Sequence, residues 1–314
     1  MKTQLILRLR YPFPCSVSPH APFVENEVQK WIEEYTCLPK ALLNRYRHSR
    51  FGGLGPRFFP QASLDRLIPL SRFFLWIFAH DDFFGPWSPG ELRQISQEAL
   101  AILEGESVVR NNEIMKQLAL FSSELVSYVT PVWRKRFIEH MADYFKAMED
   151  EQSYNHGKLI AYPSVESYMV LRTRTSAMFA VTDLLEIAMN RILPPFVLDH
   201  PDIQRLILLT NRFTAWSNDC LSLARERGLE ATNLVLIIQH ANKCSLEEAI
   251  EATIAQHDHD IQAFMTIRSS LPDFGVWQQA VEEYIQGLEW MAAGHLDWYN
   301  YTMRYEESSA ERVI

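Results

Sequence analysis

The stretch 218–226 carries the spacing that most restricts the fold of this chain. Asn218, Ser222 and Glu226 recur every four residues within a sequence that otherwise reads as a helix. Each step of four residues moves a side chain only about 40° around a helix axis and about 6 Å along it. The three side chains therefore share one face of a helix, where their oxygens can converge on a single hard cation.

A second group of oxygens follows an apolar run. Asp81 and Asp82 follow the apolar residues Phe73–Ile77 by one helical turn, and the character of that run indicates burial. Carboxylates at a buried helix end are costly unless a cation or a donor meets them. Two oxygen clusters on two otherwise apolar helices suggest a magnesium site that captures a polyphosphate. The alternative, that both are solvated surface faces of a helical binding protein, stays open on the residues alone.

The sequence pattern of the rest of the chain predicts a series of consecutive helices. It contains only 11 glycines, and alternating strand patterns are scarce. Helix starts are marked by capping boxes at 88–91 and 245–248 and by Thr130-Pro131. No linker or repeat divides the chain, so we predict one all-α domain over 1–314 with ten or more helices. The predicted helices are 24–36, 39–48, 61–84, 89–104, 110–128, 131–152, 164–190, 201–227, 230–242, 246–270 and 275–303.

Composition narrows the functional classes. A content of 47% hydrophobic residues supports a large core, and the net charge of −9 argues against nucleic acid as a partner. Residues 1–22, with four prolines from Pro12 to Pro22, are expected to form an extended N-terminal arm. No signal peptide is evident, and no apolar stretch approaches the roughly 20 residues of a membrane span. Four cysteines without metal-binding spacing are typical of reduced thiols in the cytoplasm.

Four motifs of this chain stand in the same order as those of one known family. Residues 81–85 read DDFFG and resemble the aspartate-rich motif DDxx(D/E). Residues 218–226 read NDCLSLARE and match the second metal motif, NDxxSxx(K/R)E, at every position. Arg172 resembles the diphosphate-sensing arginine of this family, and the segment 298–305 ends in an Arg-Tyr pair. By these motifs the chain resembles the class I terpene synthases, in particular their microbial single-domain members, over nearly its whole length.

The resemblance implies a helical bundle around a central apolar cavity, three Mg²⁺ ions and a prenyl diphosphate substrate. In this family aromatic side chains line the cavity and diphosphate is drawn away by metal ions and guanidinium groups. The metal ligands implied by the resemblance are Asp81, Asn218, Ser222 and Glu226, with Asp82 as a weaker candidate. The implied diphosphate-binding residues are Arg172, Arg225, Arg304 and Tyr305, and all of these except Arg225 are also the implied catalytic residues. The implied residues of the pocket wall are Phe74, Phe78, Ser176 and Trp298.

This sequence departs from the family pattern at two positions. Gly85 stands where the family often has the last acid of its first motif, which weakens the case for Asp82 as a ligand but not for Asp81. Ser176 stands where a small residue, usually glycine, breaks a helix and presents a backbone carbonyl to the substrate, so we expect a break at 175–177. Arg174 is a rival to Arg172 for the sensor role.

The expected activity is Mg²⁺-dependent ionisation of a linear prenyl diphosphate to an allylic cation, followed by cyclisation. We expect farnesyl diphosphate and a sesquiterpene product, with geranyl or geranylgeranyl diphosphate as alternatives. A chain-elongating prenyltransferase ranks lower because it would need a second aspartate-rich motif. The enzyme is expected to be a cytoplasmic monomer or homodimer.

Overall fold

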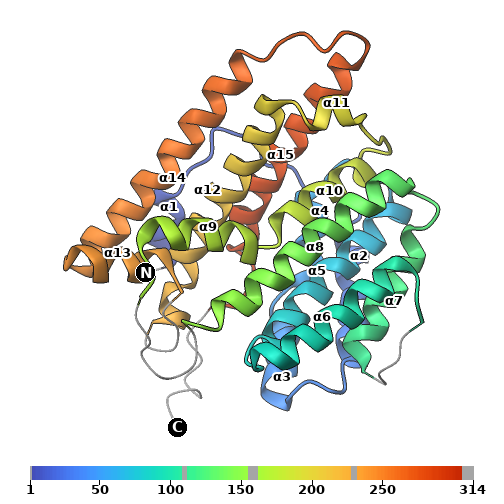
Figure 1. The fold of residues 1–314 in the computed structure, drawn as a ribbon, viewed down its shortest axis with the longest axis horizontal. Coiled ribbons are helices and arrows are strands. Elements are labelled where there is room, and N and C mark those ends of the chain that lie inside the picture. The colour runs from blue at the N-terminus through green and yellow to red at the C-terminus, as the bar shows by residue number, and fades with distance from the viewer. Residues whose placement is uncertain (1, 108–111, 155–161, 228–231, 306–314) are drawn as a thin grey trace.

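The computed structural model describes residues 2–107, 112–154, 162–227 and 232–305. Helices connected by short loops make up these segments (Figure 1). The elements are α1 (Lys2–Arg8), α2 (Ala21–Glu34), α3 (Lys40–His48), η1 (Phe51–Gly53), α4 (Gly55–Phe58), α5 (Leu64–Phe84), α6 (Pro89–Glu104), α7 (Glu113–Leu125), α8 (Pro131–Glu151), α9 (Val165–Thr175), α10 (Met178–Ala188), α11 (Pro195–Leu198), α12 (Pro201–Glu226), α13 (Leu234–Asn242), α14 (Leu246–Ser269), η2 (Gly275–Trp277) and α15 (Gln278–Trp298).

The all-α prediction is confirmed, and local signals account for many helix starts. The Ser88 and Ser245 hydroxyls accept hydrogen bonds from the third residue of α6 and α14, and the reciprocal glutamate bonds complete both capping boxes. The Thr130 side chain likewise accepts a hydrogen bond from the third residue of α8, Trp133, but without a reciprocal side-chain bond. The predicted helix starts at 110 and 230 lie outside the described residues. No helix in the described part of the chain has the length and apolarity that crossing a bilayer requires.

The prediction that residues 1–22 form an extended arm is wrong at its start. Lys2–Arg8 form α1, which packs against α12. Leu5 and the following Leu9 are both buried, because a spacing of four residues places them on one helical face. Arg8 pairs with Glu247 and Glu251 on α14. Burial of its apolar face against other helices therefore stabilises this short helix. The proline-rich residues that follow, up to the start of α2, form no regular structure.

Two groups of helices surround the centre of the molecule. In Figure 1, α12, α14 and α15 lie on one side, and α5, α6, α7 and α8 lie on the other, with α9 and α10 between them. Buried Trp76 and Trp216 anchor the cores of α5 and α12. The two helices that carry the predicted oxygen clusters thus stand on opposite sides of a shared interior.

The predicted helix 164–190 is interrupted where the sequence indicated. Helix α9 ends at Thr175 and α10 begins at Met178. Between them Ala177 has a left-handed backbone with φ of 57°, which costs a residue with a Cβ about 1–2 kcal/mol. The Ser176 hydroxyl donates to Asn211 Oδ1 at 2.7 Å, and Asn211 Nδ2 donates to the Thr173 carbonyl at 3.0 Å. Asn211, on α12, therefore stabilises the break from outside the broken helix.

Candidate active site

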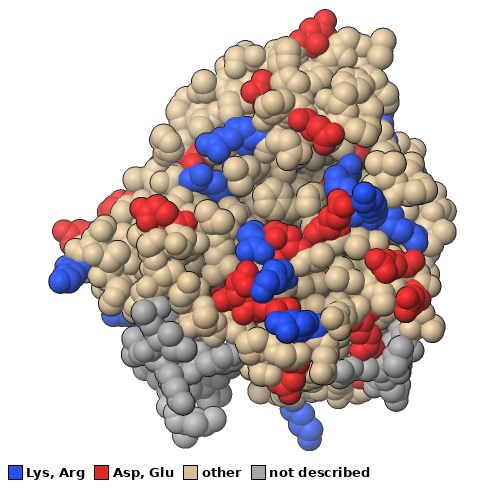
Figure 2. Space-filling model, viewed as in Figure 1, with Lys and Arg blue, Asp and Glu red and all other residues tan. Residues whose placement is uncertain are grey.

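A cavity of about 470 Å³ opens between α4, α5, α8, α9, α10, α12 and α15. Charged side chains of both signs gather in the middle of the face shown in Figure 2. The apolar part of the wall comes from side chains such as Leu54, Phe58, Phe74, Phe78, Met178 and Val181. The charged part comes from Asp81, Asp82, Glu151, Arg172, Arg225, Glu226 and Arg304. The cavity therefore joins an apolar chamber to a charged region.

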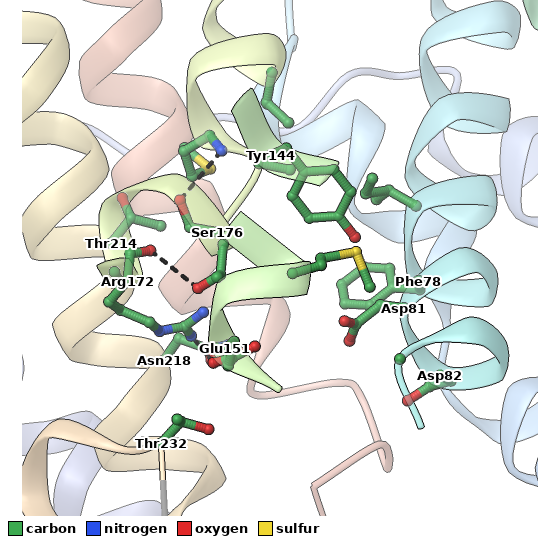
Figure 3. A pocket seen from close by; sticks show the side chains of 18 of the residues that line it. Phe78, Asp81, Asp82, Tyr144, Glu151, Arg172, Ser176, Thr214, Asn218 and Thr232 are labelled. Atoms are coloured by element: carbon green, nitrogen blue, oxygen red, sulfur yellow. Dashed lines mark hydrogen bonds between the residues drawn. The ribbon is translucent and has the colours of Figure 1, made fainter. Parts of the chain in front are cut away.

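The predicted metal-binding clusters face each other across this cavity. In Figure 3, Phe78, Asp81 and Asp82 lie on the α5 side. Arg172 and Asn218 lie on the opposite side. The end of α5 and the middle of α12, more than a hundred residues apart in the sequence, therefore line the same cavity.

Asp81 is a carboxylate that meets no partner. Its side chain is exposed to the cavity, and it makes no hydrogen bond or ion pair with another described residue. Protein nevertheless surrounds the cavity, so desolvation, together with the charge of Asp82, raises the pKa of Asp81. A carboxylate held in this state favours binding of a cation from outside the chain.

Asp82 is, by contrast, already paired. Both its oxygens accept from Arg304, at 2.6 and 3.0 Å, and Arg225 and the Tyr46 hydroxyl add bonds of 3.2 and 2.7 Å. Burial alone would raise the pKa of Asp82, but the two guanidinium groups hold it well below its usual range. Asp82 therefore orients the arginines of the site, which fits its place as the weaker metal candidate.

The α12 cluster occupies one helical face. Asn218 and Glu226 line the cavity, whereas the Ser222 side chain is buried beside Glu226 and does not reach the cavity wall. Asn218 accepts from Arg172 Nη2 at 2.7 Å and donates to the Tyr299 hydroxyl. Burial, with the charge of Asp219, raises the pKa of Glu226.

Asp219 holds the arginine of α9 in place, a function that the motif did not reveal. Its carboxylate accepts from Arg172 Nε, the Tyr168 hydroxyl and the Leu234 backbone nitrogen at 2.8, 2.9 and 2.8 Å. It is 1% exposed and points away from the cavity-lining face of α12. Its place beside Asn218 in the matched motif was the available signal.

The two candidate sensor arginines separate clearly. Arg172 lines the cavity and contacts α12, as described above. Arg174 pairs with Asp143 and Asp150 on α8 and does not reach the cavity. Of the two arginines, only Arg172 is in a position to meet a ligand in the cavity.

Most of the residues predicted to line the pocket do line the cavity, but one does not. Phe74, Phe78 and Tyr305 line the cavity, as do Ser176 and Arg225. The expectation for Trp298 needs correction. Trp298 is fully buried behind Phe78, at 5.9 Å between ring centroids, and its Nε1 donates to the Arg50 carbonyl. Packing of α15 against the η1 segment turns this indole away from the cavity.

Several wall residues carried no motif in the sequence. They are Tyr144, Met148, Glu151 and Gln152 near the end of α8, together with Thr214, Thr232 and His295. Burial raises the pKa of Glu151 to about 7, with the charge of Asp81 acting in the same direction against that of Arg172. Only the packing of α8 and α15 against α5 and α12 brings these side chains to the cavity.

Sequence comparisons identify relatives of the chain over nearly all its length. Residues 72–263 match the family described as terpene synthase family 2, C-terminal metal binding. The (+)-T-muurolol synthase of Roseiflexus castenholzii is 30% identical over 305 residues, which cover 95% of this chain and 93% of that protein. The germacrene A synthase of Nostoc punctiforme is 27% identical, with 94% and 93% covered.

Solved structures share the fold. Germacradien-4-ol synthase from Streptomyces citricolor superposes with a TM-score of 0.79 at 23% identity, covering 94% of this chain and 98% of that one. The structure of a-eudesmol synthase gives 0.83 at 18% identity, with 93% and 98% covered. The match to the family over more than half the chain, and the 30% identity to a relative over 95% of it, show that this chain belongs to terpene synthase family 2.

Proposed function

We propose that this chain is a Mg²⁺-dependent sesquiterpene cyclase that ionises farnesyl diphosphate and releases diphosphate. The observation that carries this proposal is that Asp81 and the Asn218–Glu226 face meet across one cavity with aromatic walls. Two relatives, from Roseiflexus castenholzii and Streptosporangium roseum, bear names that specify cyclisation of farnesyl diphosphate. We assign the activity to one domain, 1–314, acting in the cytoplasm as a monomer or homodimer.

The residues present fit a magnesium centre. Asp81 offers an unpaired carboxylate, and Asn218 and Glu226 offer further oxygens, which are the ligands that Mg²⁺ prefers. Among the described residues, no three His, Cys, Asp or Glu side chains gather into a site of their own. Shared coordination with substrate phosphate would complete such sites. We propose three ions, held by Asp81 on one side and by Asn218 and Glu226 on the other. Ser222, which lies between them on the same face of α12 but is buried, would join this ligand set only by turning its hydroxyl toward the cavity.

The arginines of the charged region are suited to the diphosphate. Bound metal ions would supply neutralisation of the roughly three negative charges on the leaving group. Arg172 is oriented by Asp219, and Arg304 and Arg225 by Asp82, so their guanidinium forks are placed before substrate arrives. We propose that these arginines, with the Tyr305 hydroxyl, donate hydrogen bonds to phosphate oxygens.

The apolar chamber would hold the hydrocarbon chain. Its volume of about 470 Å³ lies in the range of small-molecule sites, roughly 300–1,000 Å³. Rings such as Phe58, Phe74 and Phe78 exclude water and stabilise positive charge without acting as nucleophiles. We propose a fifteen-carbon substrate on this basis and on the names of the relatives, with ten or twenty carbons as the alternatives.

The test is incubation of the purified protein with geranyl, farnesyl and geranylgeranyl diphosphates and Mg²⁺. Released pyrophosphate and the extracted hydrocarbons, separated by gas chromatography and identified by mass spectrometry, are measured together. We expect cyclic fifteen-carbon products from farnesyl diphosphate and none after chelation of the metal. Absence of pyrophosphate release from all three substrates would overturn the proposal.

A further inference from the structure

One wall residue of the cavity is an imidazole that the metal and diphosphate chemistry does not use. His295 lies on α15, is 8% exposed, and contributes to the cavity wall. Its ring meets the rings of Phe58 and Tyr299 edge to face, with centroid distances of 6.1 and 5.1 Å. Since Phe58 in turn packs against Phe74 at 4.9 Å, His295 belongs to the aromatic part of the wall.

The polar atoms of the His295 ring are not used in bonds within the described part of the chain. Nδ1 is fully enclosed and has no hydrogen-bond partner among the described residues, so Nε2 is the ring nitrogen left to meet a ligand in the cavity. Leaving a buried polar group unpaired costs about 1–3 kcal/mol, so such groups are uncommon in a stable core. An unpaired imidazole in the wall of a binding cavity is therefore available to a ligand.

The imidazole is also uncharged. Burial, aided by the positive charge of Arg172, lowers the pKa of His295 to about 3. At neutral pH one ring nitrogen therefore keeps a lone pair. A neutral ring is compatible with a neighbouring carbocation, whereas an imidazolium would repel it.

The other lone pairs of the wall are less suited to accept a proton from carbon. The carboxylates of Asp81 and Glu226 belong to the proposed metal centre. The Glu151 carboxylate lies in the charged region of the cavity, under the charges of Arg172 and Asp81, and not among the aromatic rings. The Tyr144 and Thr214 side chains offer hydroxyl oxygens, which are much weaker bases than imidazole. Among the described wall residues, His295 is the one imidazole.

We propose that His295 accepts the proton whose loss ends the carbocation sequence and sets the position of the last double bond. This inference rests on the proposed function. A C–H bond next to the cationic carbon breaks, its electron pair forms the new C=C bond, and the proton joins the ring nitrogen. The imidazolium then returns its proton to water when product leaves, so charge and atoms balance over the cycle.

The test compares His295→Phe and His295→Gln with the unmodified protein, using farnesyl diphosphate and Mg²⁺. Phenylalanine keeps an aromatic ring against Phe58 and Tyr299, and glutamine keeps a polar group, but both remove the basic nitrogen. The matched control is His257→Phe on α14, because His257 is fully buried, has an unpartnered Nε2 and lies outside the cavity. Pyrophosphate release reports ionisation, and mass and NMR spectra of the products report the end of the reaction.

We expect both His295 variants to release pyrophosphate within about five-fold of the unmodified rate, because ionisation precedes the proton transfer. The original major product should fall about ten-fold or more, and be replaced by products with the same carbon skeleton but a displaced double bond or an added hydroxyl. The His257 variant should keep the original products.

Three results would overturn the inference. The first is an unchanged major product in both variants. The second is a changed carbon skeleton, which indicates that the substitution altered the shape of the cavity. The third is an equal loss of pyrophosphate release in both variants, which indicates a structural role for His295. Absence of pyrophosphate release from the unmodified protein would instead overturn the proposed function, and with it this inference.

Discussion

The Arg304 guanidinium donates two hydrogen bonds, of 2.6 and 3.0 Å, to the carboxylate of Asp82, which lies 222 residues earlier in the sequence. The ion pair is almost fully shielded from solvent, since the Arg304 and Asp82 side chains are 3% and 6% exposed. It connects the segment after α15 to the end of α5, directly beside Asp81. The ion pair therefore couples the position of the chain after α15 to the charged region of the cavity.

Removal of one partner of this pair should destabilise the protein. In Asp82→Ala the Arg304 guanidinium stays buried without its counter-charge, so we expect the free energy of unfolding to fall by about 3–5 kcal/mol. Urea denaturation followed by circular dichroism measures this change. Glu33→Ala, which breaks an exposed ion pair with Arg47, is the control and should cost less than about 1 kcal/mol. Equal losses in the two variants would contradict the assignment.

The neighbouring aspartate should behave in the opposite way. Asp81 has no partner among the described residues and its pKa is raised, so Asp81→Asn should leave the free energy of unfolding unchanged or increase it. The same change removes a proposed metal ligand, and pyrophosphate release should fall about 100-fold or more. Steady-state kinetics beside a thermal melt test both parts. Activity within a few-fold of the unmodified protein would remove Asp81 from the metal centre.

Ligand binding should be visible in thermal stability. Mg²⁺ and pyrophosphate together, at about 100 times their dissociation constant, should add about 2.7 kcal/mol to the native state and raise the melting temperature. Neither ligand alone should give the full shift, because the proposed ions are shared with phosphate. Glu226→Gln should lose most of the shift, while Glu247→Gln, on the exposed start of α14, should retain it. A full shift in Glu226→Gln would contradict the proposed ligand set.

Glu151 should make the metal-free protein less stable in alkali. Its pKa in the folded state is about 7, above its ordinary value of 4.5, so its contribution to stability is complete below about pH 4.5 and is lost as pH rises through 7. Glu151→Gln should therefore show a smaller fall in melting temperature between pH 5.5 and 8.5 in the presence of a chelator. Glu139→Gln, exposed on the same helix, should follow the unmodified protein. Parallel curves for all three proteins would refute this origin.

The break between α9 and α10 offers a stabilising substitution. Ala177→Gly should raise the free energy of unfolding by about 0.5–1 kcal/mol, because glycine adopts a left-handed backbone without a steric cost. Ala180→Gly, within α10, is the matched control and should lower it by about 1 kcal/mol. Chemical denaturation of the two variants decides. A loss of stability in Ala177→Gly would show that the alanine methyl group contributes more than its strain.

Local patterns in the sequence determined a large part of this protein. The spacing of Asn218 and Glu226 was sufficient to place both on one helical face, and the capping boxes at Ser88 and Ser245 marked two helix starts. The helix break beside Ser176 was also expected, from the resemblance to the family. These features depend on residues within one or two helical turns, where backbone geometry alone relates sequence to space.

Tertiary structure decided which of these faces meet. The pairing of Asp82 with Arg304, the turn of Trp298 away from the cavity, and the presence of Glu151 and His295 in its wall all depend on how α5, α8, α12 and α15 pack together. Helix α1 likewise forms where Leu5 finds an apolar surface on other helices. Such contacts join residues tens to hundreds of positions apart, and burial over the whole interior, rather than any local spacing, selects them.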